Sequence, residues 1–275
     1  MALPTLAFIG AGNMGRCLIG GLIANGHPTQ QIRAADADAA QLTALKQDFP
    51  VSTTTDNAQA VSGADVVVLA VKPQQMRAVA TKLAPVFATR QQPLVISIAA
   101  GIATRDLARW LGIPSVVRAM PNTPALIRSG VSGLYAAASV DEAQRAQAEQ
   151  IMSAVGAVIW VDDEDLIDAI TAVSGSGPAY FFLVMELMQS AALKLGLSTD
   201  QARTLVTQTA LGAARMAQES GTDVAILRAQ VTSPGGTTES ALRVMQGSGM
   251  AAIFERALAA AKVRSAEIAR QFGAE

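Results

Sequence analysis

The feature that most constrains the fold is a glycine-rich motif at the junction between a strand pattern and a helix pattern. It follows the apolar run Thr5–Ile9 and opens a helical pattern over Met14–Ala24. The motif fits G-x-G-x-x-G and consists of Gly10, Ala11, Gly12, Asn13, Met14 and Gly15. Here the first glycine permits a tight turn, the second leaves room for a pyrophosphate, and the third lets the helix pack on the strand. The motif predicts a dinucleotide site, with a tight structural turn as the alternative.

Strand and helix patterns continue to alternate after this motif. The predicted strands are Thr5–Ile9, Ile32–Ala35, Asp65–Val71, Leu94–Ile98, Val116–Arg118 and Ala157–Val161. The predicted helices are Met14–Ala24, Ala39–Asp48, Gln74–Leu83, Thr104–Leu111 and Asp141–Ala154. Continuous apolar runs such as DVVVLAV are typical of parallel strands that are buried on both faces. The alternation predicts an α/β fold with a doubly wound sheet of the Rossmann type.

After Asp162 the pattern changes to helices alone. The predicted helical stretches are Leu166–Leu195, Thr199–Glu219, Asp223–Gln230 and Gly236 to the end of the chain. We therefore expect two domains, a dinucleotide-binding Rossmann domain over residues 1–163 and an all-α domain over residues 164–275.

Composition excludes several classes of protein. The net charge is −1, so we expect no nucleic-acid partner, because such proteins need a basic surface. Apolar stretches are interrupted by glycine, proline or polar residues, so we expect no membrane span. One cysteine, Cys17, cannot form an internal disulfide, and no export signal is recognised, so we expect a cytoplasmic location. Aromatic residues are only 4% of a chain rich in alanine, which favours extensive helix packing and an oligomer.

Three positions at strand ends bear on the coenzyme. Asp36 follows the second strand, where a carboxylate accepts the ribose hydroxyls of NAD and repels a 2′-phosphate. Asp36 or Asp38 is equally suited to cap the next helix, and Arg33 is placed to assist a phosphate. Lys72 faces either the coenzyme or solvent, and small residues from Ala99 onward leave room for a flat nicotinamide ring.

Three further segments mix glycine or proline with hydroxyl and amide groups. They are MPNTPA at residues 120–125, VSGSGPAY at 173–180 and VTSPGGTT at 231–238. The last opens a helix, so it combines unpaired N–H donors, hydroxyl groups and the positive end of a helix dipole. This combination suits a carboxylate, and a hydroxyl-capped turn is the alternative.

The chain resembles the pyrroline-5-carboxylate reductase family over essentially its whole length. The resemblance is carried by FIGAGNMG, AVKPQ, SIAAG, RAMPNTPA, VSGSGPAY and, most specifically, VTSPGGTTESAL. It implies reduction of (S)-1-pyrroline-5-carboxylate to L-proline with NAD(P)H. It also implies that the helical domain dimerises, that dimers assemble further, with a decamer as one outcome, and that the active site lies between domains across the dimer interface.

The resemblance also implies roles for individual residues. The coenzyme contacts would be Gly10 to Gly15, Asn57, Ala70, Val71, Lys72, Pro73 and Ala99. The substrate contacts would be Ser233, Gly235, Gly236, Thr237 and Thr238, with Met120, Asn122 and Ser174 nearby. Family members usually favour NADPH, but Asp36 departs from the small residues common there, which leaves NADPH and NADH open.

The implied reaction needs little from catalytic side chains. Hydride attack on a protonated cyclic imine removes a positive charge, so neither a metal nor an oxyanion hole is required. We expect backbone N–H groups around Gly235–Thr237 and the Ser233 hydroxyl to bind the carboxylate. Thr238 would hydrogen-bond the ring nitrogen, or alternatively cap its helix. His27, between Gly26 and Pro28, is expected in a surface loop.

Two other functions remain open at this point. A β-hydroxyacid dehydrogenase-like reductase would use Lys194 as acid and base, although Lys194 also suits the end of a helix. A non-catalytic NADP-sensing protein would use the helical domain for assembly alone. Neither needs the SPGGTT segment. We further expect Cys17 to be a small buried residue and the acidic run at residues 162–165 to be a solvated helix start.

Overall fold

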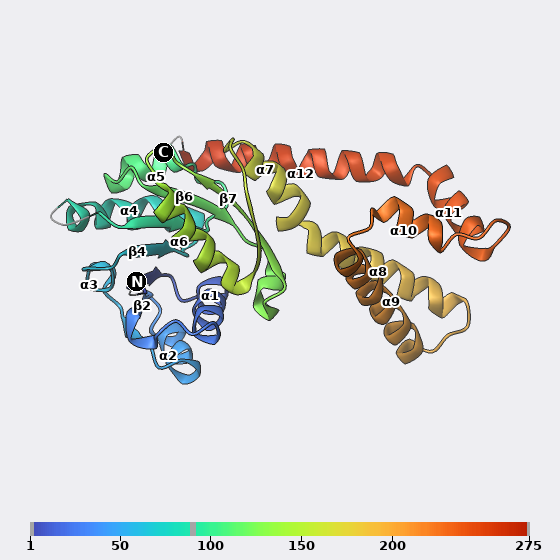
Figure 1. Ribbon diagram of the computed structural model, residues 1–275, viewed down its shortest axis with the longest axis horizontal. Helices are drawn as coiled ribbons and strands as arrows, with labels where there is room; N and C mark the ends of the chain where they lie inside the picture. Colours follow the sequence, from blue (N-terminus) through green and yellow to red (C-terminus); the bar gives the residue numbers. More distant parts are fainter. Residues whose placement is uncertain (1–2, 89–91, 274–275) are drawn as a thin grey trace. The chain divides into compact units, whose positions relative to one another are not determined.

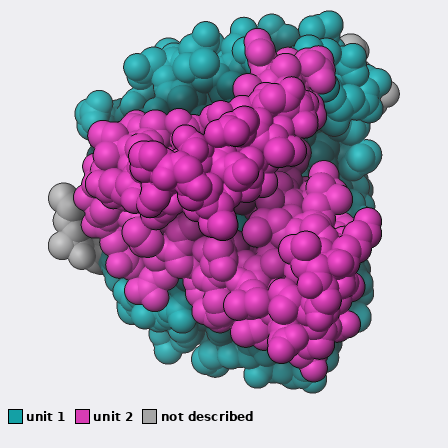
Figure 2. Space-filling view, turned by 90° about the vertical axis from the view of Figure 1, so that its right-hand side faces the viewer, with its two compact units in different colours: residues 1–176, 260–275 teal, residues 177–259 magenta. Residues whose placement is uncertain are grey.

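The computed structural model describes residues 3–88 and 92–273, which form two compact units (Figure 2). Unit 1 contains residues 1–176 and 260–275, and unit 2 contains residues 177–259. Unit 1 holds one sheet in the order β3-β2-β1-β4-β5-β6-β7-β8 (Figure 1). Its strands are β1 Leu6–Ile9, β2 Ile32–Ala35, β3 Ser52–Thr54, β4 Val66–Leu69, β5 Leu94–Ser97, β6 Val116–Met120, β7 Gly130–Ala136 and β8 Gly156–Trp160.

Helices cover both faces of this sheet. They are α1 Asn13–Ala24, α2 Ala39–Asp48, α3 Asn57–Val61, α4 Pro73–Phe87, α5 Thr104–Leu111, α6 Glu142–Met152 and α7 Leu166–Ile170. Short turns are η1 Thr29–Gln31, η2 Thr123–Ile127, η3 Ser153–Val155 and the π-helical turn η4 Thr171–Gly175. Strands β1 to β6 are mutually parallel, β7 is antiparallel to β6, and β8 is parallel to β7. The predicted Rossmann-type α/β fold is confirmed.

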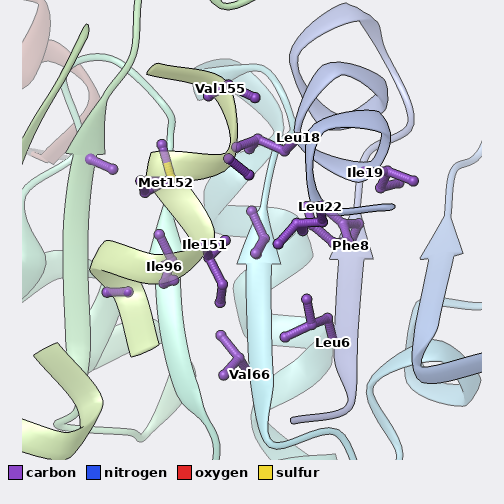
Figure 3. Close-up of a cluster of buried hydrophobic side chains, with 14 of the residues drawn as sticks. Leu6, Phe8, Leu18, Ile19, Leu22, Val66, Ile96, Ile151, Met152 and Val155 are labelled. Carbon is purple, nitrogen blue, oxygen red and sulfur yellow. The ribbon is translucent and has the colours of Figure 1, made fainter. Parts of the chain in front are cut away.

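Strand β1 is apolar at every position because helices cover both of its faces. Leu6 and Phe8 point to one face, where they pack with Leu18 and Leu22 of α1 (Figure 3). Ala7 and Ile9 belong to the core on the other face, with residues of α4 and α5. Successive side chains of a strand alternate between faces, so a strand with helices on both sides has no solvent-facing position.

Two strands escaped the sequence analysis. Strand β3 is three polar residues at the sheet edge, and β7 contains two glycines within GVSGLYA. Neither shows the continuous apolar run that identifies a strand buried on both faces. Their pairing with β2, and with β6 and β8, supplies what local propensity does not.

Unit 2 contains only helices among its described residues. They are α8 Gly177–Lys194, α9 Thr199–Ser220, α10 Val224–Gln230, α11 Thr237–Gly247 and the beginning of α12 Met250–Gly273. The expected single helix from Gly236 onward is thus two helices, because the chain breaks at Ser248 and Gly249, where Gly249 has a φ of 78°. Helix α9 begins with a capping box formed by Ser198 and Gln201.

Unit 2 exposes an unusual amount of apolar surface. The consecutive residues Phe181, Phe182 and Leu183 of α8 are 68%, 64% and 54% exposed. Consecutive residues of a helix point in different directions, so α8 is apolar on more than one side. Apolar surface this extensive marks an interface rather than a solvated helix.

The helical stretch Leu166–Lys194 is long and apolar enough to cross a membrane by length and composition alone, contrary to the sequence expectation. Glycine, proline and polar residues do not shorten the apolar stretch below this length, because the helix continues through the π-helical turn η4, as the predicted helix Leu166–Leu195 does. Length and composition are weak grounds for a span, because the core helices of other proteins pass the same test.

The C-terminal part of α12 belongs to unit 1. Ser265 of α12 donates a hydrogen bond to Asp168 of α7 (2.7 Å), and Phe272 packs on the core formed with α4 and α5. By contacts, the chain therefore divides at Ser176 and again at Ala260, whereas the sequence analysis places one boundary at 163/164. The two differ because a helix pattern does not show which unit its far end contacts.

Arg128 has a φ of 56°, and no other non-glycine residue in the described part of the chain has a positive φ. It ends η2 in the left-handed region, with its N–H donating to the Ala125 carbonyl (2.9 Å). We expect Arg128→Gly to raise the free energy of unfolding by about 0.5–1 kcal/mol, since glycine adopts this conformation without strain. Urea unfolding measures the change. Arg128→Ala keeps the strain, so an equal gain in that variant contradicts the explanation.

Candidate functional site

The glycine motif forms a loop packed between the ends of β1 and β4. Gly10 has a φ of 105°, and a Cβ there would lie 2.6 Å from the Ala70 carbonyl oxygen. A Cβ on Gly15 would lie 2.3 Å from the Gly10 carbonyl oxygen. At Gly12, by contrast, a Cβ would meet no described atom within 4 Å. The first and third glycines are thus required because a side chain there would collide with backbone atoms, whereas the second glycine borders open space.

The same loop leaves hydrogen-bond donors for an anion. Helix α1 begins at Asn13, and in the described structure no side chain caps it. The first N–H groups of a helix have no partner within the helix, and they carry its positive dipole end. Open space at Gly12 beside uncapped N–H groups fits the pyrophosphate of a dinucleotide.

Asp36 is fixed against this loop. Its Oδ2 accepts a hydrogen bond from the Ala11 N–H (2.7 Å), and its Oδ1 accepts one from the Asp38 N–H (2.9 Å). Asp38, not Asp36, caps α2 by accepting from the Ala40 N–H (2.8 Å). The carboxylate of Asp36 therefore stands between the glycine loop and the end of β2. Arg33, the expected phosphate partner, instead donates to the Ser62 carbonyl (2.6 Å).

The remaining predicted coenzyme residues follow the carboxyl ends of neighbouring strands. Asn57 begins α3 after β3, Ala70 to Pro73 join β4 to α4, and Ala99 follows β5. In a parallel sheet these ends lie along one edge, and this edge binds ligands in open α/β folds. The Ala70 N–H donates to the Ile9 carbonyl (2.7 Å), which joins this edge directly to the glycine loop. Lys72 is exposed at the start of α4.

Asn122 lies against Ser174, and Met120 lies against the neighbouring Gly175, but the polar groups of Asn122 and Ser174 are occupied. The Asn122 amide donates to the Ser174 carbonyl (3.1 Å) and accepts from the Val131 N–H (3.0 Å). The Ser174 hydroxyl donates to the Ile170 carbonyl (3.0 Å). A Cβ on Gly175 would lie 2.7 Å from Cε of Met120. The structure therefore joins the end of β6 to the turn η4.

The segment Ser233–Thr238 forms a turn that opens α11 in unit 2. Gly235 has a φ of 71°, and the Gly236 N–H donates to the Ser233 carbonyl (3.0 Å). The Gly235 N–H donates to the Glu239 carboxylate (2.9 Å). Two of the N–H groups expected to bind substrate are thus engaged within the loop. Donors remain in the first turn of α11, which begins at Thr237 and is not capped by any described side chain.

The surroundings of His27, Cys17 and Lys194 can be compared with those expected from the sequence. His27 is 7% exposed rather than on a surface loop, and its Nε2 lies 3.1 Å from the Pro4 carbonyl oxygen. Burial lowers the pKa of His27, an effect that the Pro4 hydrogen bond partly offsets. Cys17 is half-buried, its Sγ donates to the Ala125 carbonyl (2.7 Å), and burial raises its pKa. Lys194 is exposed in the last turn of α8.

A buried charged network escaped the sequence analysis. Arg118 is 4% exposed and lies 3.3 Å from Glu164 and 3.6 Å from Asp168. Glu164 also accepts from the N–H and hydroxyl of Thr104, both at 2.8 Å. The sequence analysis expects Glu164 in a solvated acidic run, but the side chain is half-buried because it bonds to Arg118 and Thr104. An arginine within the apolar strand β6 was the signal for it.

Two family models match separate parts of the chain. The one described as "Pyrroline-5-carboxylate reductase dimerisation" matches residues 164–268. The one described as "NADP oxidoreductase coenzyme F420-dependent" matches residues 5–101.

Individual proteins match over nearly the full length. A pyrroline-5-carboxylate reductase from Pseudomonas aeruginosa is 56% identical over 99% of this chain and 100% of its own. The solved pyrroline-5-carboxylate reductase from Coxiella burnetii has a TM-score of 0.93 and 48% identity, covering 97% of this chain and 99% of its own. The Plasmodium falciparum pyrroline carboxylate reductase, solved with NADP bound, has a TM-score of 0.83 and 27% identity, covering 97% of this chain and 98% of its own. With the glycine loop, the turn η4 and the loop before α11 all falling inside these matches, the chain belongs to the pyrroline-5-carboxylate reductase family.

Proposed function

We propose that this chain is an NADPH-dependent oxidoreductase that reduces (S)-1-pyrroline-5-carboxylate to L-proline. The observation that carries the proposal is the uncapped first turn of α11, which follows the Ser233–Gly236 turn in a chain that also has a dinucleotide loop. A helix N-terminus without a side-chain cap suits an anion, and the substrate is a carboxylate. Similarity over nearly the full length to proteins named pyrroline-5-carboxylate reductase supports the same reaction.

In this proposal the substrate carboxylate binds the N–H groups of Thr237 and Thr238 and the Ser233 hydroxyl. Gly235 and Gly236 shape the turn rather than donate, since their N–H groups are already used. The Thr238 hydroxyl makes a hydrogen bond to the ring nitrogen and holds the protonated imine in place. Met120 ends β6, Asn122 follows it, and Ser174 belongs to the turn η4 that Asn122 contacts.

The chain's main task is orientation. When bound, NADPH supplies the hydride that forms the new C–H bond at the imine carbon. Because the imine is protonated beforehand, its positive charge is lost as the C=N bond becomes a C–N bond, and no negative charge needs stabilising. The coenzyme would be held by the glycine loop, Asn57, Ala70 to Pro73 and Ala99, whose task is to fix its orientation relative to the substrate.

Assembly and location belong to the same proposal. Residues 164–268 match a dimerisation model, and unit 2 exposes the apolar surface of α8, so we propose a homodimer that assembles further, up to a decamer. On this view a second copy of the chain, not lipid, covers the apolar helix, and the enzyme works in the cytoplasm. We propose that residues 1–163 bind the coenzyme and that residues 164–275 serve substrate binding and dimerisation.

An assay with purified protein tests the activity. NADPH and pyrroline-5-carboxylate are mixed with enzyme, and absorbance at the NADPH band is followed. We expect imine-dependent oxidation of NADPH, and no reduction of NADP⁺ with simple hydroxyacids. Hydroxyacid oxidation without imine reduction would indicate a β-hydroxyacid dehydrogenase. Coenzyme binding without any turnover would indicate a sensor. Either result rejects the proposal.

Asp36 gives a prediction about coenzyme preference. We expect Asp36→Ser to raise the ratio of kcat/KM with NADPH to that with NADH about tenfold, because a carboxylate no longer opposes the 2′-phosphate. Both coenzymes should bind somewhat less tightly, since the Ala11 N–H loses its partner. Steady-state kinetics with each coenzyme measures the ratio.

Asp38→Ser is the matched control, because it removes the same charge two residues away and serine still caps α2. An unchanged ratio in Asp36→Ser, or the same change in both variants, contradicts a specific role of Asp36.

A further inference from the structure

The long helix of residues 166–194 contains a proline that leaves one carbonyl without its usual partner. In an α-helix the N–H of residue 178 would donate to the carbonyl of Ser174. Residue 178 is proline, which has no N–H and whose ring crowds the carbonyl four residues earlier. The carbonyl of Ser174 therefore needs a donor from elsewhere.

The helix contains the π-helical turn η4 just before this proline. The Ser176 N–H donates to the Thr171 carbonyl (2.8 Å), five residues back rather than four. Such turns are rare and costly, and they occur often at functional sites. This one follows α7 and precedes α8.

The missing donor comes from Asn122. Its Nδ2 donates to the Ser174 carbonyl (3.1 Å), and its Oδ1 accepts from the Val131 N–H at the start of β7 (3.0 Å). The side chain is only 9% exposed, and both its ends are bonded to backbone. Asn122 thus links three segments: the end of β6, the start of β7 and η4.

The link is reinforced by close packing. A Cβ on Gly175 would lie 2.7 Å from Cε of Met120, so the backbone of η4 packs against the end of the Met120 side chain, which comes from the end of β6. This end of β6 lies on the same sheet edge as the ends of β1, β4 and β5, where the coenzyme residues lie. The hydrogen bonds of Asn122 therefore fix the position of η4 along that edge, and Gly175 lets it pack on Met120.

We propose that Asn122 is a positioning residue for imine reduction, which holds η4 at the coenzyme edge of the sheet by bonding the carbonyl that Pro178 leaves open. It acts through η4 and does not touch the substrate. The inference rests on the proposed reductase function, and it replaces a contact role for Asn122 with an indirect one.

The test variant is Asn122→Asp. It keeps an oxygen for the Val131 N–H but turns a second oxygen toward the Ser174 carbonyl, so the anchor is lost. Because a displacement near 1 Å costs up to about 100-fold in rate, we expect the single-turnover rate of hydride transfer to fall about 10- to 100-fold. The Kd for NADPH should change by less than about twofold, since the pyrophosphate loop is not altered. The isotope effect with deuterated NADPH should rise as hydride transfer becomes limiting.

A second variant separates positioning from stability. Asn122→Asp with Pro178→Ala returns an N–H to residue 178, which can satisfy the Ser174 carbonyl within the helix. We expect this double variant to regain most of the Tm lost in Asn122→Asp without regaining the rate of hydride transfer. Ile113→Val is the stability control: Ile113 is buried before β6 at the opposite edge of the sheet, and this change should lower the Tm by a few degrees at an unchanged rate.

The outcomes are distinct. A wild-type rate in Asn122→Asp, or a double variant that regains rate and Tm together, overturns the positioning role. If the wild-type enzyme itself does not reduce the imine, the proposed function fails, and that result is read from the wild type alone.

Discussion

A Thr238→Ala enzyme is expected to reduce pyrroline-5-carboxylate with a kcat/KM about 10- to 150-fold below wild type, because a hydrogen bond to a charged group contributes about 1.5–3 kcal/mol. The Kd for NADPH should not change. Thr238 is the second residue of α11, and its hydroxyl does not cap the helix, whose N-cap is Gly236. The effect should therefore fall on the reaction and not on the fold.

Stopped-flow kinetics and thermal unfolding of the same preparation measure both quantities. Thr238→Ser retains the hydroxyl and is expected to keep most of the activity, which makes it the matched control. Wild-type kinetics in Thr238→Ala would refute the role. So would a loss of Tm with unchanged kinetics, which is the result that a capping role predicts.

A Gly12→Val enzyme is expected to fold normally and to lose coenzyme binding, with the Kd for NADPH raised more than about 100-fold. The physical reason is the open space at Gly12, where a Cβ meets no described atom within 4 Å. Its φ of −68° is acceptable to any residue, so the backbone is not strained. The added isopropyl group would fill the space that a pyrophosphate needs.

Fluorescence titration with NADPH and a thermal melt test this prediction. Gly15→Ala is the contrasting variant, because its Cβ would lie 2.3 Å from the Gly10 carbonyl oxygen and should lower the Tm. If Gly12→Val binds NADPH as tightly as wild type, the coenzyme does not pass over this loop.

Much of the fold was predictable because it is encoded locally. Strand β2 and helices α2 and α5 have the predicted bounds, since alternation, capping and apolar periodicity all agree there. Strand β7 was missed because its glycines carry no strand propensity and its place depends on pairing with β6 and β8.

Site features were likewise predictable where they are encoded locally and were missed where they depend on residues far apart in the sequence. The glycine loop was predictable because three glycines at this spacing, between a strand pattern and a helix pattern, indicate a dinucleotide loop. The link from Asn122 to Ser174, and from Glu164 to Arg118, joins residues about fifty positions apart, which no local pattern reveals. The burial of His27 was missed for the same reason: flanking glycine and proline indicate a turn but not what covers it.

A crystal structure of the enzyme with NADP⁺ and L-proline tests the central claim most directly. The account predicts that the proline carboxylate accepts hydrogen bonds from the first turn of α11, with the Thr238 hydroxyl near the ring nitrogen. It also predicts that the ring carbon faces the nicotinamide held above the ends of β4 and β5. A proline carboxylate bound elsewhere, with the Ser233–Thr238 loop remote from the coenzyme in every subunit of the assembly, would contradict it.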